Sequence, residues 1–330
     1  MRVGRKRLIL GLMGCLLLLL TNGSALAQAL KPATFIPQWS PQAQFAGYFV
    51  AHAKGFYRQR GLDLTILRGG PDRPSGEMLA SEQADFGTLF LTSGIALRAQ
   101  GVAVVNVGQI VQRSALLLVA RKTSSIVSPV DFNGKRVSVW GDFQLQPLTF
   151  FRRNNLEVTI VPQGYTLNLF LLGGVDAASA MWYNEYHTIL NAGIDADELN
   201  TFFLADHGLN FPEDGIYCLE TTLQRDPAMV RAFVQGSLAG WRYAFDHPEE
   251  ALDVVMQHVT MANLPTNRVH QKWMLARMAD IIRPPQSTQA MGTLMATDYR
   301  FVTEQLFGSG IINTIPEYEI FHDPNHLAQQ

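Results

Sequence analysis

The chain has 330 residues, of which 47% are hydrophobic and 16% are charged, and its net charge is −2. This composition excludes a disordered or fibrous chain, and the length suits about two globular domains. The nearly balanced charge gives no reason to expect nucleic acid or an anionic membrane surface as a partner.

Residues 1–27 have the three parts of a secretory signal peptide. Basic residues occupy four of the first seven positions, an apolar run at 8–20 is too short to span a bilayer comfortably, and Ala25 and Ala27 form a cleavage site. We expect cleavage after Ala27 and secretion into the periplasm. A lipoprotein box at Cys15 is the weaker alternative because five leucines follow it, and the choice between a free and a lipid-anchored form stays open.

The first part of the expected mature chain alternates helices and strands. Phe45, Phe49 and Phe56 follow helical spacing after Pro41, and Gly61 is placed to end that helix. Strands are predicted at 62–67, 84–87, 102–111 and 115–120, and helices at 77–83 and 92–100. This alternation is typical of an α/β domain with a mainly parallel sheet.

A second α/β unit follows the polar stretch 121–128. Its strands are predicted at 136–140, 158–162, 177–183 and 199–205, with helices at 148–153, 168–172 and 186–192. A polar segment containing Pro212 ends this unit. Helical patterns then follow at 226–247, 249–258, 266–282 and 289–306.

This order of elements predicts two lobes. Lobe 1 is discontinuous and comprises residues 28–120 plus 216–330, and lobe 2 comprises residues 121–215. Two crossing segments would form a hinge, and the cleft between the lobes would be the binding site.

The sequence carries no motif of catalysis or metal binding. It lacks GxSxG, P-loop, HExxH and paired-cysteine patterns. His322 and His326 have i,i+4 spacing, but Pro324 between them argues against a metal site. Cys218 is the one cysteine outside the predicted signal peptide, so we expect no internal disulfide. We expect no catalytic residue, no metal and no cofactor.

Aromatic and polar residues gather in four clusters where an expected strand meets the next helix or loop, which is where α/β sheets bind ligands. The predicted ligand-binding residues are Trp39, Gln42, Gln44, Tyr48, Thr92, Ser93, Trp140, Asp142, Phe143, Trp182, Asn184 and Glu185. Tryptophans beside amides and carboxylates suit a flat heteroaromatic ligand, stacked between rings and hydrogen-bonded at its edge.

Structural explanations compete with this interpretation. Trp39 would cover the edge of a sheet, Thr92 and Asp142 would cap helices, and Glu185 would lie in a first helical turn, where the helix dipole favours a negative charge. Phe45 is expected in the core, because it lies on the buried stripe of its helix.

Five stretches between residues 38 and 220 resemble the periplasmic substrate-binding proteins of ABC importers, in the branch that includes binding proteins for alkanesulfonates and for the thiamine pyrimidine precursor. They are PQAQFAGYFVAHAKGFYRQRGLDLTI, MLASEQADFGTLFLTSGIALRAQG, SPVDFNGKRVSVWGDFQ, GGVDAASAMWYNEYHTILNAGID and FPEDGIYCLE. The resemblance implies an α/β, two-lobed type II periplasmic-binding fold that closes around one ligand without catalysis.

The resemblance also implies a ligand class. The stretches WGDFQ and MWYNEY look more like the pyrimidine and flavin binders than the sulfonate binders. We expect a formylamino-aminomethyl-methylpyrimidine first and riboflavin second. A sulfonate ranks third, because Arg113 is the one nearby candidate for binding an anion. Enzymes of this fold that make the pyrimidine carry a cysteine-rich motif that this chain lacks, so an enzyme is the least favoured interpretation.

The expected partners are a small-molecule ligand and the permease and ATPase of an ABC importer, with the receptor itself a monomer. Trp39, Trp140 and Trp182 would wall the cleft. Glu185 would accept hydrogen bonds from an exocyclic amine, and Thr92 and Ser93 would contact a carbonyl or formyl oxygen.

Overall fold

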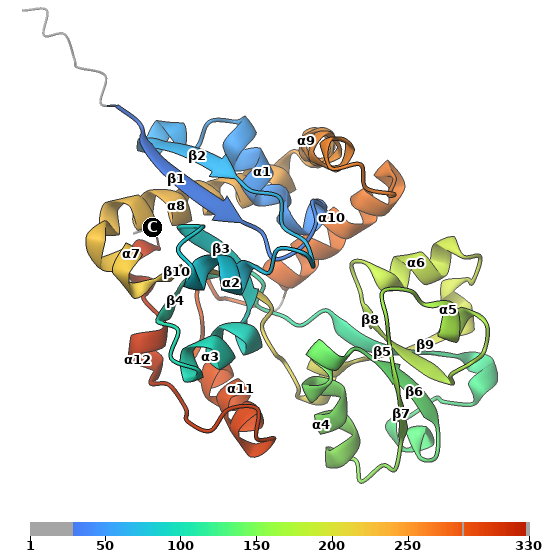
Figure 1. Cartoon of the computed structure of the whole chain (residues 1–330). Helices are drawn as coiled ribbons and strands as arrows, with labels where there is room; N and C mark the ends of the chain where they lie inside the picture. Colours follow the sequence, from blue (N-terminus) through green and yellow to red (C-terminus); the bar gives the residue numbers. More distant parts are fainter. Residues whose placement is uncertain (1–28, 286, 328–330) are drawn as a thin grey trace, which may run out of the picture. The chain divides into compact units, whose positions relative to one another are not determined.

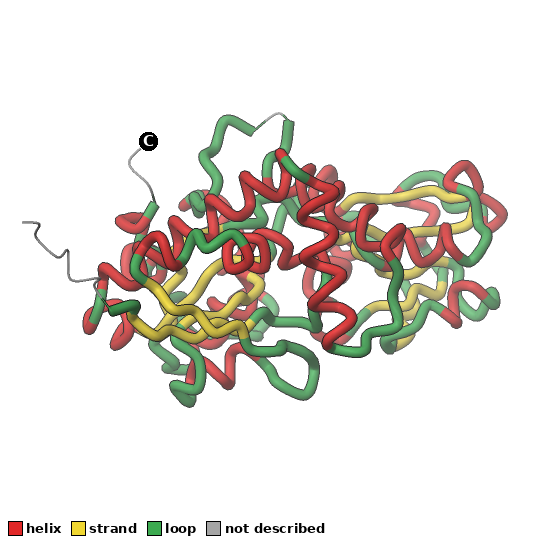
Figure 2. Tube along the Cα trace, turned by 90° about the horizontal axis from the view of Figure 1, so that it is seen from above, coloured by secondary structure: helices red, strands yellow, loops and turns green. Residues whose placement is uncertain are grey.

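The computed structural model describes residues 29–285 and 287–327. The predicted signal peptide, residues 1–27, lies outside these described residues. From Lys31 onward the chain forms one compact unit, which contains two separate β-sheets (Figures 1 and 2).

The first sheet has five strands in the order β2-β1-β3-β10-β4. Its strands are β1 (Lys31–Ile36), β2 (Leu62–Ile66), β3 (Phe86–Phe90), β4 (Val104–Gln109) and β10 (Asp214–Leu219). β1 is parallel to β2 and β3, whereas β10 is antiparallel to both β3 and β4. Strand β1 precedes every element predicted from the sequence, and its short KPATFI segment was missed there.

The second sheet repeats this arrangement in the order β7-β6-β8-β5-β9. Its strands are β5 (Leu116–Arg121), β6 (Arg136–Val139), β7 (Thr159–Pro162), β8 (Ala177–Met181) and β9 (Leu199–Phe203). β6 is parallel to β7 and β8, and β5 is antiparallel to β8 and β9. Each sheet is therefore mixed, with one antiparallel strand inserted between the others.

The strand pairing corrects the boundaries drawn from the sequence. The boundary at residue 120 cuts through β5, which belongs wholly to the second sheet. The boundary at residue 216 cuts through β10, which belongs to the first. We keep the two lobes as a proposal, with the first sheet in lobe 1 and the second sheet in lobe 2. The segments 110–115 and 204–213 then cross between them.

Helices surround both sheets. Beside the second sheet lie α4 (Leu145–Arg153), α5 (Asn168–Leu171) and α6 (Glu185–Asn191) (Figure 1). The other helices are α1 (Ala46–Ala53), α2 (Ser75–Ala80), α3 (Leu91–Ala99), α7 (Glu220–Arg225), α8 (Pro227–Asp246), α9 (Pro248–Met261), α10 (Arg268–Ile282), α11 (Ala296–Gly308) and α12 (Tyr318–Phe321). Among the described residues, no helix is both long and apolar enough to cross a membrane.

The core of lobe 1 forms where α1 packs against α8. The ring of Phe233 on α8 stacks on Phe86 of β3 with centroids 4.1 Å apart. Gly47 allows α1 to approach α8 closely, because a Cβ at this position would lie 2.3 Å from the ring of Trp241 on α8. Phe45 is fully buried, which confirms its predicted place in the core.

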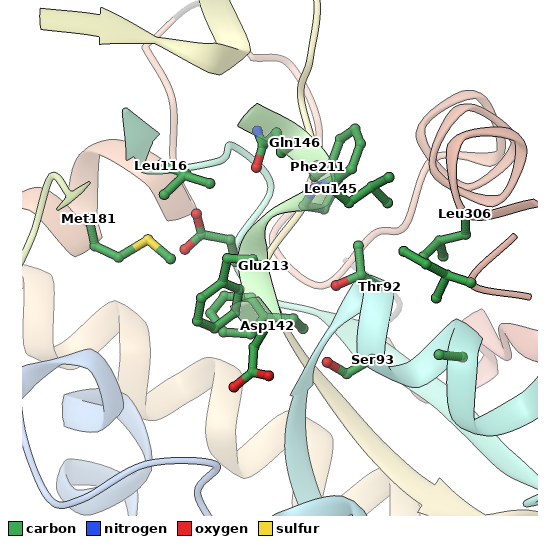
Figure 3. Close-up of a pocket in the computed structure, with 15 residues that line it drawn as sticks. Thr92, Ser93, Leu116, Asp142, Leu145, Gln146, Met181, Phe211, Glu213 and Leu306 are labelled. Carbon is green, nitrogen blue, oxygen red and sulfur yellow. The ribbon is translucent and has the colours of Figure 1, made fainter. Parts of the chain in front are cut away.

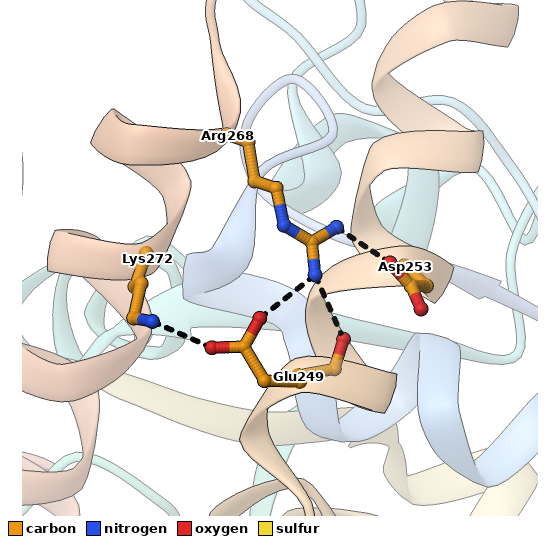
Figure 4. Close-up of polar contacts among 4 residues, drawn as sticks. All are labelled: Glu249, Asp253, Arg268 and Lys272. Carbon is orange, nitrogen blue, oxygen red and sulfur yellow. Dashed lines mark hydrogen bonds and ion pairs between the residues drawn. The ribbon is translucent and has the colours of Figure 1, made fainter.

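One helix cap and a surface ion network fix the direction of α10. The side chain of Asn267 accepts a hydrogen bond from the backbone N–H of His270 and so caps α10. Arg268 of α10 bonds Glu249 and Asp253 of α9 at 2.9 and 2.5 Å, and Lys272 bonds Glu249 at 2.6 Å (Figure 4). These exposed pairs add little stability each, but together they hold α10 against α9.

Candidate functional site

A cavity of about 150 Å³ lies where elements of both sheets meet (Figure 3). The N-terminus of α3 supplies Thr92 and Ser93, and the segment before α4 supplies Asp142 and Phe143. The other lining residues are Phe90, Ala96, Leu116, Leu145, Gln146, Met181, Phe211, Pro212, Glu213, Leu306 and Ile311. Most of this wall is apolar, with a few polar groups converging on it, as in typical small-molecule sites.

Glu213 is the buried charged residue of this cavity, with 4% of its surface exposed. It lies on the second crossing segment. Its Oε1 atom accepts hydrogen bonds from the backbone N–H of Ala115 at 2.5 Å and from Ser114 Oγ at 3.2 Å, both on the first crossing segment. Its Oε2 atom is buried and has no hydrogen-bond partner among residues 29–285 and 287–327. Glu213 therefore ties the two crossing segments together through Oε1, while Oε2 makes no hydrogen bond with them.

Asp214, the next residue, is 2% exposed and has different surroundings. Its Oδ2 atom accepts a hydrogen bond from Gln44 Nε2 at 2.9 Å, and its Oδ1 atom accepts one from Gln38 Nε2. Gln44 in turn accepts a hydrogen bond from Gln42 Nε2 at 2.6 Å. Both carboxylate oxygens of Asp214 are thus satisfied by amide donors.

Burial changes the acidity of these carboxyls. Desolvation, followed by the negative charge of Asp214, raises the pKa of Glu213 to about 8. Desolvation raises the pKa of Asp214 to about 7, partly offset by the hydrogen bond from Gln44. Burial raises the pKa of Tyr183. The negative charges of Glu213, Asp214 and Glu185 raise it further.

Four predicted site residues line this cavity: Thr92, Ser93, Asp142 and Phe143. The rings of Phe143 and Phe90 meet edge to face across it, with centroids 4.9 Å apart. Thr92 is not the N-cap of α3, because the helix begins at Leu91 and Phe90 occupies the cap position.

A second, more polar pocket of about 410 Å³ contains three other predicted residues, Trp39, Gln42 and Asn184. Its remaining lining residues are Ser40, Pro41, Thr188, Asn191, Leu264, Pro265, Thr266, Asn267, His270 and Gln271. The ring of Trp39 also lies 5.9 Å from that of Tyr165, which belongs to lobe 2. The hydrogen bonds from Gln42 through Gln44 to Asp214 connect this pocket to the residue next to Glu213.

A pair of histidines joins the two lobes beside the second pocket. His187 of α6 and His270 of α10 approach each other with their Nδ1 atoms 2.9 Å apart. His270 Nε2 lies 2.8 Å from Asn184 Oδ1, and Asn184 Nδ2 donates to Glu185 Oε1 at 2.7 Å. Since Asn184 uses its amide N–H toward Glu185, its oxygen faces His270 and receives the Nε2 proton. His270 Nδ1 is then the acceptor of its ring, and His187 Nδ1 lies between it and Asn191 Nδ2, which is 3.2 Å away.

Three predicted ligand-binding residues, Tyr48, Trp140 and Trp182, line neither of these two pockets. Tyr48 is 1% exposed and packs in the core against Phe35 and Trp241, because α1 turns this side of the helix toward α8. The indole of Trp182 packs under the guanidinium of Arg277, 4.6 Å from it, and lines neither pocket.

Trp140 also lines neither pocket, because its Nε1 atom donates to the backbone carbonyl of Gly164 at 3.0 Å. Its edge contact with Phe143, at 6.1 Å between centroids, places it behind the residue that does line the cavity.

Two further predicted residues, Gln44 and Glu185, are hydrogen-bonded within the protein. Gln44 is 4% exposed and holds Asp214. Glu185 accepts hydrogen bonds from the backbone N–H of Met181 at 3.0 Å and from Asn184, and burial raises its pKa to about 7. Neither residue lines either of the two pockets, and Glu185 holds the amide of Asn184, which lines the second one.

Sequence reasoning missed Glu213, Asp214, Gln146 and His270. Glu213 and Asp214 belong to the stretch FPEDG, which was interpreted as a polar boundary between units. The available signal was the pair of adjacent acidic residues directly before a β-strand, with apolar residues on both sides. His270 and Gln146 lie inside helices and carry no distinguishing pattern.

Basic residues are missing from both pocket walls. The residues that line the two pockets, all from the described part of the chain, include no lysine and no arginine. Arg113, the candidate for binding a sulfonate, instead bonds Asp206 at 2.6 Å. Within residues 29–285 and 287–327, no group of three or more His, Cys, Asp or Glu side chains is placed to hold a metal ion.

Family comparison gives the context for this site. The NMT1/THI5-like family matches residues 42–251 of the chain. The chain belongs to this family. The match covers both crossing segments, Glu213 and Asp214, and it ends within α9.

Curated relatives of this NMT1/THI5-like chain include both binding proteins and enzymes. The riboflavin-binding protein RibY of Chloroflexus aurantiacus is 27% identical over 250 residues, covering 71% of this chain and 68% of the relative. The formylaminopyrimidine-binding protein of Halalkalibacterium halodurans is 24% identical over 255 residues, covering 74% and 76%. A 4-amino-5-hydroxymethyl-2-methylpyrimidine phosphate synthase of Legionella pneumophila is 25% identical, covering 71% and 75%.

Solved structures confirm the fold. The periplasmic sulfonate-binding protein SsuA of Methylobacillus flagellatus superimposes with a TM-score of 0.69 at 15% identity, covering 91% of this chain and 93% of that one. The aliphatic sulphonate-binding SsuA of Escherichia coli gives 0.66 at 16% identity, covering 88% and 95%. The NMT1/THI5-like chain therefore has the α/β periplasmic-binding fold that was expected from its sequence.

Proposed function

We propose that this protein is the extracytoplasmic receptor of an ABC importer and binds a small, planar nitrogen heterocycle, with an aminopyrimidine of the thiamine-precursor type as the first choice. The fold and the relatives named as binding proteins support this assignment. The receptor would deliver its ligand to the permease and ATPase of the importer, acting as a monomer in the periplasm.

The observation that carries the proposal is the unpartnered Oε2 atom of Glu213 in an otherwise apolar and aromatic cavity. A buried polar atom without a partner costs free energy, and a ligand that bonds it recovers that cost. Phe143 and Phe90 would pack on the faces of a ring, and Thr92 and Ser93 would reach its substituents. At about 150 Å³ the cavity is smaller than the roughly 300–1,000 Å³ of a drug-sized site, which favours a single ring.

Riboflavin is the second candidate, favoured by the second pocket. This pocket is larger, about 410 Å³, and combines the ring of Trp39 with amide and hydroxyl groups. Aromatic and amide side chains together suit a ring system that carries a polyhydroxyl chain. The sulfonate ranks third, because an anion would face two buried carboxyls and no basic side chain from the pocket walls.

A receptor is favoured over a pyrimidine-forming enzyme, although several relatives have the name of a synthase. Cys218 is fully buried in β10 and lines neither pocket. Cys15, the other cysteine, lies in the predicted signal peptide. A cysteine-based reaction would therefore lack its thiol at the candidate site.

Calorimetric titration of the purified protein tests the proposal. The probes are 4-amino-5-hydroxymethyl-2-methylpyrimidine, its N-formyl aminomethyl analogue, riboflavin and taurine. We expect saturable one-to-one binding of a pyrimidine, unchanged probe after incubation, and no heat with taurine. Binding of taurine alone, or turnover of a pyrimidine, would contradict the proposal.

A further inference from the structure

We infer that Glu213 recognises the ligand as a neutral carboxylic acid, whose Oε2–H group donates a hydrogen bond to an unprotonated ring nitrogen or a carbonyl oxygen. This inference rests on the proposed function and specifies how the site selects its ligand. It reverses the role expected of a carboxylate, which would accept hydrogen bonds from an amine.

The two carboxyl oxygens of Glu213 have unequal hydrogen bonding. The N–H of Ala115 and the hydroxyl of Ser114 both bond Oε1, and the backbone N–H of Leu116 is a further donor near the carboxyl. Among the described residues, Oε2 has no hydrogen-bond partner. An ionised carboxylate spreads its charge over two equivalent oxygens, so one-sided solvation leaves half of that charge buried without compensation. A protonated acid fits instead, with Oε1 as the carbonyl oxygen and Oε2 as the hydroxyl.

The carboxyl of Asp214, the next residue, competes with that of Glu213 for the negative charge. Asp214 receives one amide N–H on each oxygen, from Gln44 and Gln38, so it is the better solvated of the two. Neither carboxyl forms an ion pair with a basic side chain of the described residues. Two adjacent buried carboxyls without a cation do not both ionise, and the charge goes to the group whose two oxygens are both hydrogen-bonded. The proton therefore stays on Glu213, in agreement with its pKa of about 8 against about 7 for Asp214.

The hydroxyl of a protonated Glu213 would lie in mainly apolar surroundings. Glu213 lines the cavity together with Phe143 and Phe211, and the side chains of Met181 and Leu116 lie beside its carboxyl (Figure 3). Ten of the fifteen lining residues are apolar, and the polar ones besides Glu213 are Thr92, Ser93, Asp142 and Gln146. A heterocycle with a lone pair in its plane, such as a pyrimidine nitrogen or a flavin carbonyl, supplies an acceptor for this hydroxyl. A phosphate or sulfonate meets the negative charge of Asp214 behind the donor and is rejected.

The decisive comparison is Glu213→Gln against Glu213→Ala, measured by calorimetric titration with 4-amino-5-hydroxymethyl-2-methylpyrimidine and with its phosphate ester. Glutamine keeps a carbonyl oxygen for Ala115 and an N–H donor for the ligand, whereas alanine removes both. We expect Glu213→Gln to weaken pyrimidine binding by about threefold or less and Glu213→Ala to weaken it by about 30-fold. The phosphate ester binds the wild type at least about 30-fold more weakly than the alcohol.

The pH profile gives a readout that a purely structural role would not produce. Above pH 8 the free protein loses the Glu213 proton, so the wild-type dissociation constant rises by about tenfold per pH unit, whereas that of Glu213→Gln stays flat. The exposed Glu157, changed to Gln, is the matched control and retains the wild-type profile. This wild-type measurement tests the inference even where a variant fails to fold.

The outcomes separate the inference from the proposed function. If the wild type binds a pyrimidine or riboflavin but Glu213→Gln loses as much affinity as Glu213→Ala, Glu213 acts as an ionised acceptor and the inference is overturned. Wild-type affinity that is constant from pH 7 to 9.5 overturns it as well. If the wild type binds no heterocycle at any pH, the proposed function itself fails.

Discussion

The Nδ1 atoms of His187 and His270 lie 2.9 Å apart, one on α6 of lobe 2 and the other on α10 of lobe 1. This contact requires one ring to donate and the other to accept, so it breaks when both nitrogens carry protons. The ring of Trp273 stacks on His187 at 5.0 Å and shields the pair from water. The two histidines thus hold the lobes together only in their neutral forms.

We predict that ligand affinity weakens at acid pH because of this pair. Burial, and then the nearby His187, lowers the pKa of His270 to about 4, and burial lowers the pKa of His187. When the lobes separate, both rings return toward their ordinary pKa of about 6.5. The contact is therefore fully stable above about pH 6.5 and is lost as the pH falls toward 4, which should raise the dissociation constant several-fold between pH 7 and 5.

The surroundings of the pair support this sign. Glu185 reaches His270 only through Asn184, and Arg268 and Lys272 on α10 are engaged with Glu249 of α9. No carboxylate of the described residues pairs directly with either ring. In titrations at pH 5, 6 and 7, His270→Gln should flatten the profile, while the exposed His52→Gln keeps it. An equally steep acid limb in His270→Gln would exclude the histidine pair as its cause.

The contact between Phe90 and Phe143 leads to a second prediction. These rings come from different lobes and meet edge to face in the cavity. Aromatic pairs contribute about 0.5–1.5 kcal/mol beyond the area they bury, so Phe143→Ala should weaken pyrimidine binding by about tenfold and leave the melting temperature of the free protein almost unchanged. The control is Leu148→Ala on α4, a partly exposed residue outside the cavity. Equal affinities for the two variants would remove Phe143 from the site.

Two of the tryptophans should behave in opposite ways. Trp182 packs against Arg277 and Phe203, so Trp182→Ala should lower the free energy of unfolding by about 1–3 kcal/mol with little change in affinity for a pyrimidine. Trp39 lines the second pocket, so Trp39→Ala should weaken riboflavin far more than the pyrimidine. Urea unfolding and titration of both variants measure this. Loss of pyrimidine affinity in Trp182→Ala alone would reverse the assignment.

The fold could be predicted from the sequence because its elements are locally marked. Apolar strands alternate with helices along most of the chain. Gly61 adopts the left-handed conformation, but it ends the short helix Arg58–Arg60, whereas α1, the helix that it was expected to end, already stops at Ala53. The pairing of β5 within the second sheet and of β10 within the first could not be predicted, because strand pairing depends on contacts far apart in sequence. Residues 120 and 216, the expected boundaries, therefore fall inside these two strands.

The site was harder to predict, because a residue lines a pocket only if its side chain is accessible there and points into it. Trp39 and Phe143 line pockets. Trp140 and Trp182 line neither pocket and instead contact Gly164 and Arg277, although polar residues adjoin all four aromatics in the sequence. Glu213 looked like part of a solvated boundary. Its importance arises from the packing of the two crossing segments around it, which removes water from one carboxyl oxygen.

Folding stability should depend on pH through Glu213. Its pKa is about 8 in the folded protein against an ordinary value of 4.5, because desolvation disfavours the ionised form. The folded state therefore binds more protons between pH 4.5 and 8, so the free energy of unfolding falls as the pH rises through this window. Glu213→Gln cannot ionise and should be more stable than the wild type at pH 8 by on the order of 1–3 kcal/mol.

Urea unfolding at pH 5 and pH 8 measures this difference. Asp214, whose pKa is also raised, leaves a residual slope in the variant. Glu157→Gln, on the surface, should follow the wild type at both pH values. If Glu213→Gln is less stable than the wild type at pH 8, Glu213 is ionised and compensated in the folded protein.

The central claim is that Glu213, with its free Oε2 atom in the cavity between the lobes, selects a neutral nitrogen heterocycle. Calorimetric titration of the wild type at pH 7 with 4-amino-5-hydroxymethyl-2-methylpyrimidine, riboflavin and taurine, repeated with Glu213→Ala, tests it most directly. We predict one-to-one binding of a heterocycle that falls by about 30-fold in Glu213→Ala, and no binding of taurine. Binding of taurine, or heterocycle affinity that is unchanged in Glu213→Ala, would contradict the claim.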